Sequence, residues 1–581
     1  MNSALDAGAP ETAARRDGWR DLGRTGAAAG RALTPLSRRL GASGRELACL
    51  GAILLAAAVL RLANLPVRGG WDSDQGTEML ALRSALANGR LPTFGPEAIS
   101  VTSSFHHGAL YYDLLLPAAW LGNGDPTWVV AEIALLSLIV VPIVWWIARS
   151  IAGPAAGLSA ALLAAASASL IGYATFIWNP TLVEPGAAIA FLGAWQALRA
   201  HRPAWWVVSA VGATVAVQSH IAAVVIVLPL ALAFLLDLWT SPRERRGRIA
   251  AWGIAGVVVF AVSYLPLIVY ELGHDFPDTR GMVAYFRDPN SATSVDPGLR
   301  VLFATIRILA WPLTRWPMID PSSAALAAFT AASAIIIGLI WRLGVTARRA
   351  TEGPGDGVAT DSAGQVATPG RGATPAVEGF GVRLICAWLL LVILALGFGL
   401  HAVSEVQVQE LPTEQYHVVA DSLVFVAVGL IAGGLWRPLP RRWLTVSRRA
   451  TVVVALGAVL AWNVGHWPPL TSPDGGWPAA QAAATRLERD AAGSTMALVP
   501  LFEAKGGDAY LYPLARDGAT LLEPGRAATV VLLCDVFWLS GCGGTSEANW
   551  LATNPAGAGL TQRDQFRAAP DRILTVFRRG P

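Results

Sequence analysis

The chain has 581 residues, of which 54% are apolar and only 14% are charged, and its mean hydropathy is +0.47. Ordinary soluble domains carry about 25% charged residues, so these values exclude a soluble globular protein and disorder over most of the chain. The net charge of +4 is small, and no basic stripe with interleaved aromatic residues indicates a nucleic-acid partner. The composition therefore predicts a membrane protein.

Residues 1–46 are polar, and they run too long before the first apolar stretch to be a cleavable signal peptide. About eleven mostly apolar stretches follow, each close to the roughly 20 residues that a spanning helix needs. They lie near 47–64, 128–149, 154–174, 181–199, 204–219, 221–238, 249–270, 323–341, 383–401, 419–436 and 450–464. This pattern predicts a mostly α, polytopic membrane helix bundle over residues 47–464.

Arginine positions predict which way the chain faces. Arginines gather in residues 1–46, 243–248 and 437–449, whereas the loop 402–418 contains neither Arg nor Lys. With eleven spans the three arginine-rich segments share one side, which should be cytoplasmic. The N-terminus is then inside and the C-terminus outside. The expected outer loop 271–322 does not fit well, since it carries Arg280, Arg287, Arg300, Arg307 and Arg315.

Two segments differ from the apolar stretches. Residues 343–381 are rich in Gly, Ala, Thr and Pro and cannot bury a core, which predicts a disordered cytoplasmic linker. Residues 465–581 predict a small extracytoplasmic α/β domain that is large enough for its own core. Its short apolar runs at 496–500, 529–534 and 573–577 are typical of strands, and 477–491 is typical of an amphipathic helix.

Two cysteines, Cys534 and Cys542, lie in the segment CDVFWLSGC of this outer domain. An oxidising exterior permits a disulfide between them. Two cysteines near the end of a strand can also simply be buried, and the sequence leaves both interpretations open.

The first outer loop, residues 65–127, is too long for a plain connection, and long loops are usually functional. Asp72 and Asp74 follow the first span, and the apolar spacing from Thr77 to Asn88 predicts a helix lying along the membrane surface. A carboxylate there can accept the proton of an attacking hydroxyl as a general base. The alternative is that these acids cap the helix, where Asp is favoured.

Further along this loop, a second short apolar segment of about 12 residues carries Tyr111 and Tyr112 and is too short to span. Cations near the two acids would stabilise a phosphate leaving group. The candidates are His106, His107, Arg83 and Arg280. The alternative for the two histidines is an interfacial polar pair without a chemical role.

Other polar residues fall near the same predicted face. The candidates to line a cavity are Asn179, His220, Glu271, Glu410 and His417. The alternatives are a helix-breaking turn for Asn179, a structural histidine for His220 and a solvated loop for Glu410 and His417.

Several segments together resemble a known family. They are WDSDQG at 71–76, HHGALYYDLLLPAAWLG at 106–122, TFIWNPTLVEP at 175–185, VQSH at 217–220 and PLIVYELGHDFPDTRG at 266–281. In their order and their location on one face they resemble the GT-C glycosyltransferases, in particular the bacterial protein O-mannosyltransferase and aminoarabinose-transferase branch. The resemblance covers roughly residues 47–470. Gln75 stands where that family usually has Glu, and no Lys lies near the loop.

The resemblance implies a bacterial plasma-membrane enzyme that transfers a sugar from a polyprenyl phosphate to a protein, glycolipid or cell-wall glycan. Asp74 would be the base, Arg280 with the histidines would bind phosphate, and Tyr111 and Tyr112 would line the donor site. The lipid tail would lie between helices, and membrane lipid would be a further partner. Attack would invert the anomeric carbon. A divalent metal stays open, because Asp72 and Asp74 alone supply fewer oxygens than a hard cation usually takes.

Two other classes compete with this interpretation. A transporter would usually show internal repeats and charges at mid-membrane, whereas here the acids and histidines cluster at one surface. A non-catalytic cell-envelope assembly protein is favoured only by the outer domain, in which we recognise no catalytic motif.

Overall fold

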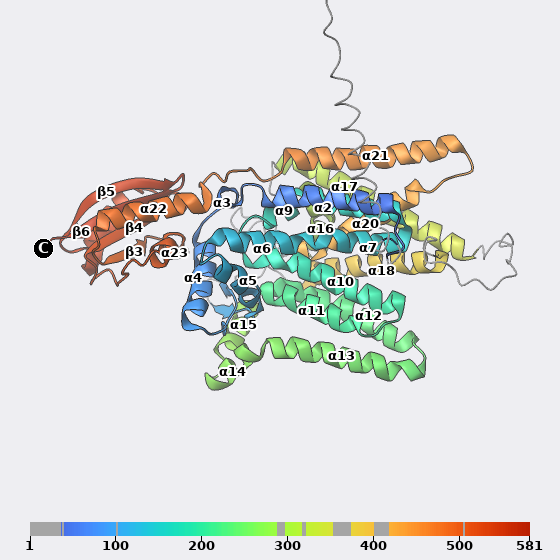
Figure 1. The fold of residues 1–581 in the computed structure, drawn as a ribbon, viewed down its shortest axis with the longest axis horizontal. Helices are drawn as coiled ribbons and strands as arrows, with labels where there is room; N and C mark the ends of the chain where they lie inside the picture. The colour runs from blue at the N-terminus through green and yellow to red at the C-terminus, as the bar shows by residue number, and fades with distance from the viewer. Residues whose placement is uncertain are drawn as a thin grey trace, which may run out of the picture.

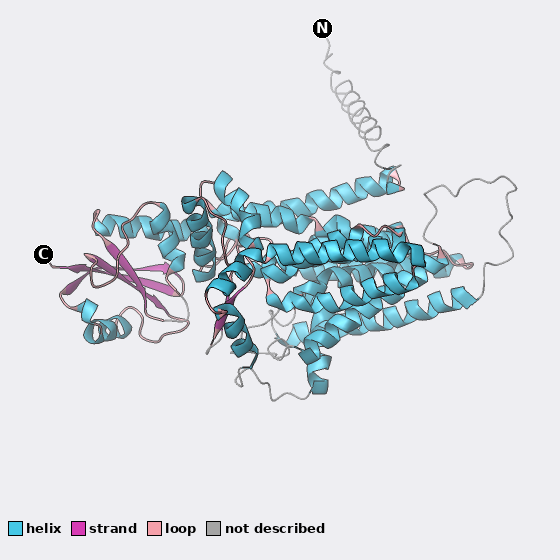
Figure 2. Ribbon diagram, turned by 90° about the horizontal axis from the view of Figure 1, so that it is seen from below, coloured by secondary structure: helices cyan, strands magenta, loops and turns pink. Residues whose placement is uncertain are grey.

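The computed structural model describes residues 37, 40–99, 103–287, 297–315, 321–351, 374–399, 417–502 and 506–580. A long bundle of helices forms one part of the molecule, and the larger sheet lies at its far end (Figures 1 and 2). The predicted class of a mostly α, polytopic membrane protein is confirmed.

Every predicted apolar stretch coincides with helix. The bundle contains α2 (Gly44–Leu62), α6 (Pro126–Leu138), α7 (Val140–Ala152), α8 (Pro154–Ala166), α9 (Ala168–Tyr173), α10 (Val183–Ala200), α11 (Trp205–Ser219), α12 (Val227–Thr240), α13 (Arg243–Ser263), α17 (Pro321–Thr351), α18 (Pro375–Leu394), α20 (Asp421–Trp436) and α21 (Arg442–Gly465).

Seven helical segments in the described ranges are long and apolar enough to cross a membrane. α8 and α11 are apolar but shorter, because Ser167 and His220 end them. The count of eleven spans therefore stays a prediction. α13 and α21 lie at opposite edges of the bundle in Figure 1, and only 11% of either span is buried inside the protein, which leaves both largely open to lipid.

The segment 271–322, predicted as an outer loop, contains a helix that packs inside the bundle. α16 (Pro297–Thr314) contacts α9, α17 and α20, and Arg300 and Arg307 on it are buried. The prediction was wrong here because the two arginines and Pro312 interrupt an otherwise apolar run. Because Arg300 and Arg307 are buried, fewer exposed arginines remain in this segment to conflict with an outer location.

The predicted linker is shorter than 343–381, because α17 continues to Thr351 and α18 begins at Pro375. The carboxylate of Glu378 lies within ion-pair distance of Arg342, Arg349 and Arg437, the last at 2.6 Å. These pairs hold the facing ends of α17 and α18 together. The middle of the predicted linker lies outside the described residues.

The C-terminal segment, residues 476–580, contains a four-stranded sheet in the order β3–β4–β6–β5. Its strands are β3 (Met496–Pro500), β4 (Thr529–Asp535), β5 (Leu560–Ala569) and β6 (Arg572–Arg579), and its helices are α22 (Gly476–Ala491), α23 (Asp508–Arg516) and α24 (Thr545–Thr553). β3 and β4 run parallel, while the other neighbours are antiparallel. The sequence predicted β3, β4, β6 and α22, but not the rest.

The outer loop that precedes the bundle contains two helices and a hairpin. α4 (Ser73–Asn88) and α5 (Leu110–Leu121) are the expected short helices, and β1 (Glu97–Ile99) pairs antiparallel with β2 (Ser104–His106). α3 (Leu65–Arg68) connects the first span to them.

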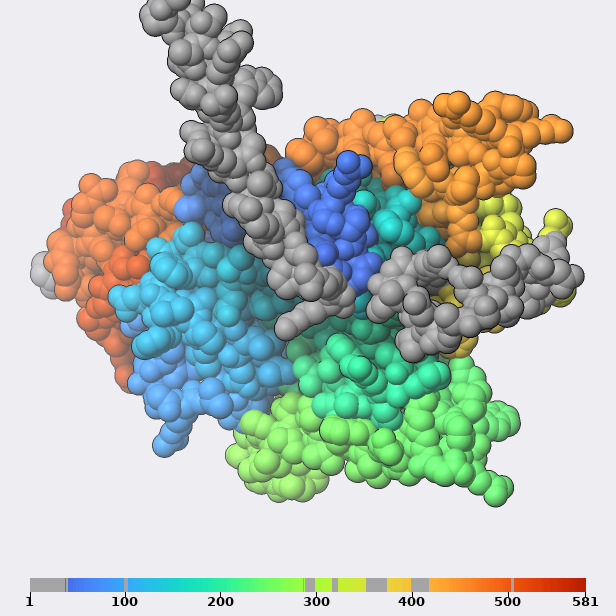
Figure 3. All heavy atoms as spheres, turned by 45° about the vertical axis from the view of Figure 1, so that its right-hand side comes forward, coloured from blue at the N-terminus to red at the C-terminus, as the bar shows by residue number. Residues whose placement is uncertain are grey.

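The C-terminal segment shares its main core with this outer loop. One continuous apolar cluster joins Met79 of α4 and Leu115 of α5 to Leu487 of α22 and Val531 of β4. Only a small cluster around Phe577 belongs to the segment alone. The C-terminal residues pack directly against the loop in the space-filling view (Figure 3). The C-terminal segment was expected to have a core of its own. Instead, it shares its main core with the outer loop.

We expect Gly76→Ala to destabilise the protein by about 1–3 kcal/mol, the usual cost of overpacking. A Cβ at position 76 would lie 2.1 Å from the carbonyl oxygen of Asp508, where α4 and α23 touch. Gly51→Ala on α2 is the control, because no atom lies within 4 Å of its Cβ position and Ala favours helix. Thermal unfolding in detergent should show a lower midpoint for the first variant only. Equal midpoints would contradict this contact.

Candidate active site

The N-terminus of α4 is organised by a capping box. The carboxylate of Asp72 accepts a hydrogen bond from the backbone N–H of Asp74 at 2.9 Å, and the side-chain oxygen of Gln75 accepts from the N–H of Asp72 at 2.9 Å. The Gln75 amide also donates to the carbonyl oxygen of Ile177 at 2.7 Å. Asp72 is therefore a helix cap. The side chain of Gln75 also joins the start of α4 to the turn before α10.

Trp71 anchors the start of this helix. Its backbone N–H donates to the carboxylate of Asp474, its indole N–H donates to the carbonyl oxygen of Ala509, and its own carbonyl oxygen accepts from Arg572, each at 2.7 Å. The ring is 4% exposed and lies 4.7 Å from that of Trp477. Residues from both ends of the C-terminal segment thus determine where α4 begins.

Asp74 lies half-buried in the first turn of α4, and in sequence it falls between Ser73, which lines one cavity, and Thr77, which lines another. The α4 cavity, of about 790 Å³, is lined by Thr77, Ala81, Ser84, Ala85, Asn88, Arg90, Leu91, Pro92, Thr93, Phe94, Gly95, Glu97, His106 and Tyr112. The C-terminal cavity, of about 340 Å³, is lined by Asp72, Ser73, Pro500, Phe502, Gly506, Ala509, Leu533, Asp535, Phe537, Trp538, Asp571 and Arg572. Because residues three apart on a helix share a face, Asp74 adjoins Thr77 at the end of the α4 cavity.

Glu78 is an acid that the sequence analysis missed. It lies one helical turn after Asp74, is 5% exposed and hydrogen-bonds Tyr112. Burial raises the pKa of Glu78 to about 8; the Tyr112 bond opposes the shift and the nearby Asp74 carboxylate adds to it. At neutral pH this carboxyl group is thus mostly protonated beside Asp74. The i, i+4 spacing from Asp74 was the signal that could have identified it.

His106 ends strand β2 and reaches the α4 cavity. Its Nδ1 lies 2.9 Å from a carboxylate oxygen of Asp278, and its backbone N–H donates to the same oxygen at 3.1 Å. Asp278 belongs to α15 (Pro277–Arg287), which packs against β2. The structure thereby brings the predicted His106 together with an acid from the 266–281 segment.

His107 is buried, and its environment favours the neutral form of the ring. Its Nδ1 donates to the carbonyl oxygen of Pro96 at 2.8 Å, and burial lowers the pKa of His107 to about 4, with Pro96 opposing and His106 adding to the shift. The ring is therefore neutral at physiological pH and supplies no positive charge to a phosphate. His220, 5.6 Å away between ring centres, also has a lowered pKa, because of burial and the neighbouring His107.

The two predicted arginines lie outside both cavities. Arg280 is 63% exposed and pairs with Asp275 at 2.7 Å, and Arg83 is exposed on α4. Arg90, which the sequence analysis did not single out, lines the α4 cavity instead. Tyr111 is fully buried behind Tyr112, so only Tyr112 borders this cavity.

The remaining candidates include two side chains with structural partners. Glu271 caps α15 by accepting from the backbone N–H groups of Asp278 and Thr279, both at 2.9 Å. Burial opposes ionisation of Glu271, but the bonds from Thr279 and Asp278 outweigh it and lower its pKa. Asn179 donates to the carbonyl oxygen of Ser219 at 2.9 Å and joins two helix ends.

His417 and Glu410 differ in how far the structure describes them. His417 is buried at the start of a short 3-10 helix (Val418–Ala420). Glu410 lies outside the described residues. Within the described ranges, no three or more His, Cys, Asp and Glu side chains gather where a metal ion would bind.

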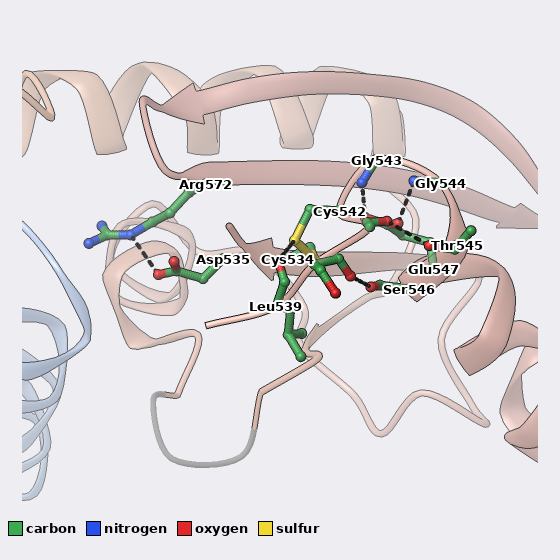
Figure 4. Close-up of a disulfide and its surroundings, with 12 residues drawn as sticks. Cys534, Asp535, Leu539, Cys542, Gly543, Gly544, Thr545, Ser546, Glu547 and Arg572 are labelled. Carbon is green, nitrogen blue, oxygen red and sulfur yellow. Dashed lines mark hydrogen bonds and ion pairs between the residues drawn. A yellow bond between two sulfur atoms is a disulfide. The ribbon is translucent and has the colours of Figure 1, made fainter. Parts of the chain in front are cut away.

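Cys534 and Cys542 form a disulfide, with Cα atoms 5.4 Å apart. The bridge closes the loop after β4, and Figure 4 shows Asp535 beside it, joined to Arg572. Glu547 supports the end of this loop by accepting from the backbone N–H groups of Gly543 and Gly544 at 2.9 and 2.8 Å.

The bundle and the C-terminal segment together share their fold with solved structures of ArnT, a GT-C membrane glycosyltransferase. The resemblance drawn from the sequence segments is thus confirmed at the level of the fold. No family model matches the sequence, and no curated protein matches it.

Among similar solved structures are two of ArnT from Cupriavidus metallidurans. The apo structure has a TM-score of 0.52 at 13% identity, and the structure bound to undecaprenyl phosphate has 0.52 at 12%. Each similarity covers 92% of this chain and 98% of the other. The oligosaccharyltransferase from Archaeoglobus fulgidus has a TM-score of 0.47 at 12% identity, covering 83% of this chain and 65% of the other.

We expect Glu78→Gln to change how stability depends on pH. Because the folded state raises the Glu78 pKa from 4.5 to about 8, its protonation stabilises the fold fully below pH 4.5, and this contribution is lost as the pH rises to about 8. Glutamine cannot ionise, so the variant should gain stability relative to wild type between these limits. Unfolding midpoints at pH 5 and 8.5 measure the difference. The exposed Glu97→Gln is the control, and a pH-independent difference for Glu78→Gln would contradict the assignment.

Proposed function

We propose that the protein is an inverting glycosyltransferase that takes its sugar from a polyprenyl phosphate at the outer face of a bacterial plasma membrane. The observation that carries this proposal is the position of Asp74 in the first turn of α4, a helix whose start lines one cavity through Ser73 and whose later turns line another from Thr77 onwards. The fold supports it, because ArnT, which shares the fold, has been crystallised with undecaprenyl phosphate.

In the proposed reaction, Asp74 accepts the proton of an acceptor hydroxyl while the hydroxyl oxygen attacks the anomeric carbon. The bond from that carbon to the phosphate oxygen breaks, its electron pair leaves with polyprenyl phosphate, and the configuration inverts. The departing phosphate gains negative charge, so nearby donors and cations assist it without a general acid. His106, paired with Asp278, and Arg90 border the α4 cavity and are the groups we assign to this task.

The lipid tail needs an apolar path beside the bundle. A groove of about 490 Å³ lies among α11, α12 and α13, with a lining of mainly apolar side chains. Trp206, Leu230 and Phe234 form one part of it and Ala250 and Phe260 another. We assign the groove to the polyprenyl chain.

The topology we propose has eleven spans, with residues 1–46 cytoplasmic and 465–581 outside. The disulfide between Cys534 and Cys542 supports this orientation, because disulfides persist in oxidising compartments. A reporter fused after residue 475 should therefore read as extracytoplasmic, and a cytoplasmic signal would place Asp74 on the wrong side of the membrane.

Asp74→Asn should lower transfer by at least about 10²-fold, because general-base catalysis contributes about 10²–10⁴-fold. Release of polyprenyl phosphate from radiolabelled polyprenyl-phosphate mannose or arabinose measures the rate. Asp72→Asn is the comparison variant: asparagine caps a helix as well as aspartate does, so the rate should fall less than for Asp74→Asn. An Asp74→Asn variant with full activity would exclude this residue as the base.

Ala250→Phe should raise the KM for a full-length polyprenyl donor about tenfold, because the larger side chain fills the apolar groove. The effect should disappear with a donor whose lipid is cut to a few carbons. Ala251→Phe, at the next and lipid-exposed position of α13, is the control and should leave both KM values unchanged. An equal loss for long and short donors would mean that the groove does not hold the chain.

A further inference from the structure

We propose that the C-terminal cavity is a carbohydrate-binding site, in which aromatic rings after β3 and in the disulfide-closed loop, together with carboxylates at the end of β4, before β6 and at the cap of α4, hold the sugar of the acceptor. Its role for the acceptor rests on the proposed function, but the binding of carbohydrate does not. A neutral, hydroxyl-rich glycan is the ligand class that the lining fits.

One wall of this cavity is aromatic. The rings of Phe502 and Trp538 are stacked, with centres 4.9 Å apart and planes 3° from parallel, and Phe537 meets Trp538 edge-on at 4.8 Å. Phe537 is 65% exposed. A group of apolar rings that is bordered by polar residues is typical of an interaction site. The electron-rich face of an aromatic ring suits the weakly positive C–H groups on the flat side of a sugar.

The cavity also has polar lining residues, which are held by bonds within the protein. One oxygen of Asp535 accepts from the backbone N–H of Phe537 at 2.9 Å, and the other lies 3.8 Å from Nε of Arg572. An oxygen of Asp571 lies 4.0 Å from the same nitrogen. A carboxylate has about four acceptor positions, so Asp535 and Asp571 retain capacity to accept hydroxyl hydrogens.

The charge balance selects against anions. Three carboxylates, from Asp72, Asp535 and Asp571, line the cavity together with a single guanidinium, that of Arg572. Arg572 is also committed to the Trp71 carbonyl oxygen at 2.7 Å. Among the described lining residues, carboxylates outnumber the guanidinium, which disfavours a phosphate and favours a neutral polyol that can donate its hydroxyl hydrogens.

The loop that carries these groups is held in place before any ligand arrives. The disulfide joins Cys534, directly before Asp535, to Cys542, four residues after Trp538 (Figure 4). The backbone N–H of Val536 donates to the carbonyl oxygen of Asp571 at 2.7 Å and ties the loop to the turn before β6. A site organised in advance loses less conformational entropy when it binds.

The position of the cavity links it to Asp74. Asp72 and Ser73 form its border with the outer loop, and Asp74 begins the next stretch of the same helix. A sugar held in this cavity would therefore lie beside the cap and the first residue of α4. The C-terminal segment would thus present the acceptor hydroxyl to the base, while the α4 cavity holds the donor.

The test uses the full-length protein in lipid nanodiscs and a panel of neutral oligosaccharides of mannose, arabinose, galactose and glucose. Calorimetric titration should detect binding of at least one of them to the wild type. Trp538→Ala should weaken it at least tenfold, and so should Asp571→Asn, which preserves the shape of the site if the first variant folds poorly. Val536→Ala is the control, since this exposed side chain of the same loop does not line the cavity and should leave binding unchanged.

Binding to none of the oligosaccharides, or equal binding by wild type, Trp538→Ala and Asp571→Asn, would overturn the proposal. Binding of tetramethylammonium alone would also overturn it, because the aromatic rings and carboxylates would then form a cation site. Asp74→Asn separates this proposal from the proposed function: it should lose transfer but keep oligosaccharide binding. If Asp74→Asn keeps transfer while Trp538→Ala loses binding, the base assignment fails and the carbohydrate site stands.

Discussion

The contacts of Trp71 are the constraint on which the rest of the site depends. This residue directly precedes the cap of α4, and its backbone and indole groups bond to Asp474, Ala509 and Arg572. Because a helix cap sets the direction of the first turn, these bonds decide where Asp72 and Asp74 point. A shift of the C-terminal segment would therefore move the proposed base.

The helix α4 divides the two halves of the proposed reaction. Its later turns border the α4 cavity, with His106 and Arg90, and its cap borders the C-terminal cavity. One rigid element thus separates donor from acceptor and carries the carboxylate that acts between them. Placing reactants at fixed positions is itself a large source of rate acceleration.

Much of the fold could be predicted, because apolar length and period are local properties of the sequence. The membrane helices, α22 and strands β3, β4 and β6 followed from them, whereas α16 did not, since Arg300 and Arg307 interrupt its apolar run. At the site, Asp74 was identified from its position after the first span. Glu78 could have been identified too, because it follows Asp74 by four residues on the same helix. The cavity residues Trp538 and Arg572 could not be identified from the sequence, because only tertiary packing brings them to α4.

The bond between Trp71 and Arg572 joins residues 501 positions apart. During synthesis, the first outer helix is therefore made long before Arg572. Its side of the shared apolar core stays exposed through most of translation. Such long-range contacts close late in folding. A chain that stops short of its last strand would keep its membrane helices but lack the bond from Arg572 to Trp71. The complete set of contacts around Trp71 can therefore form only after the whole chain has been synthesised.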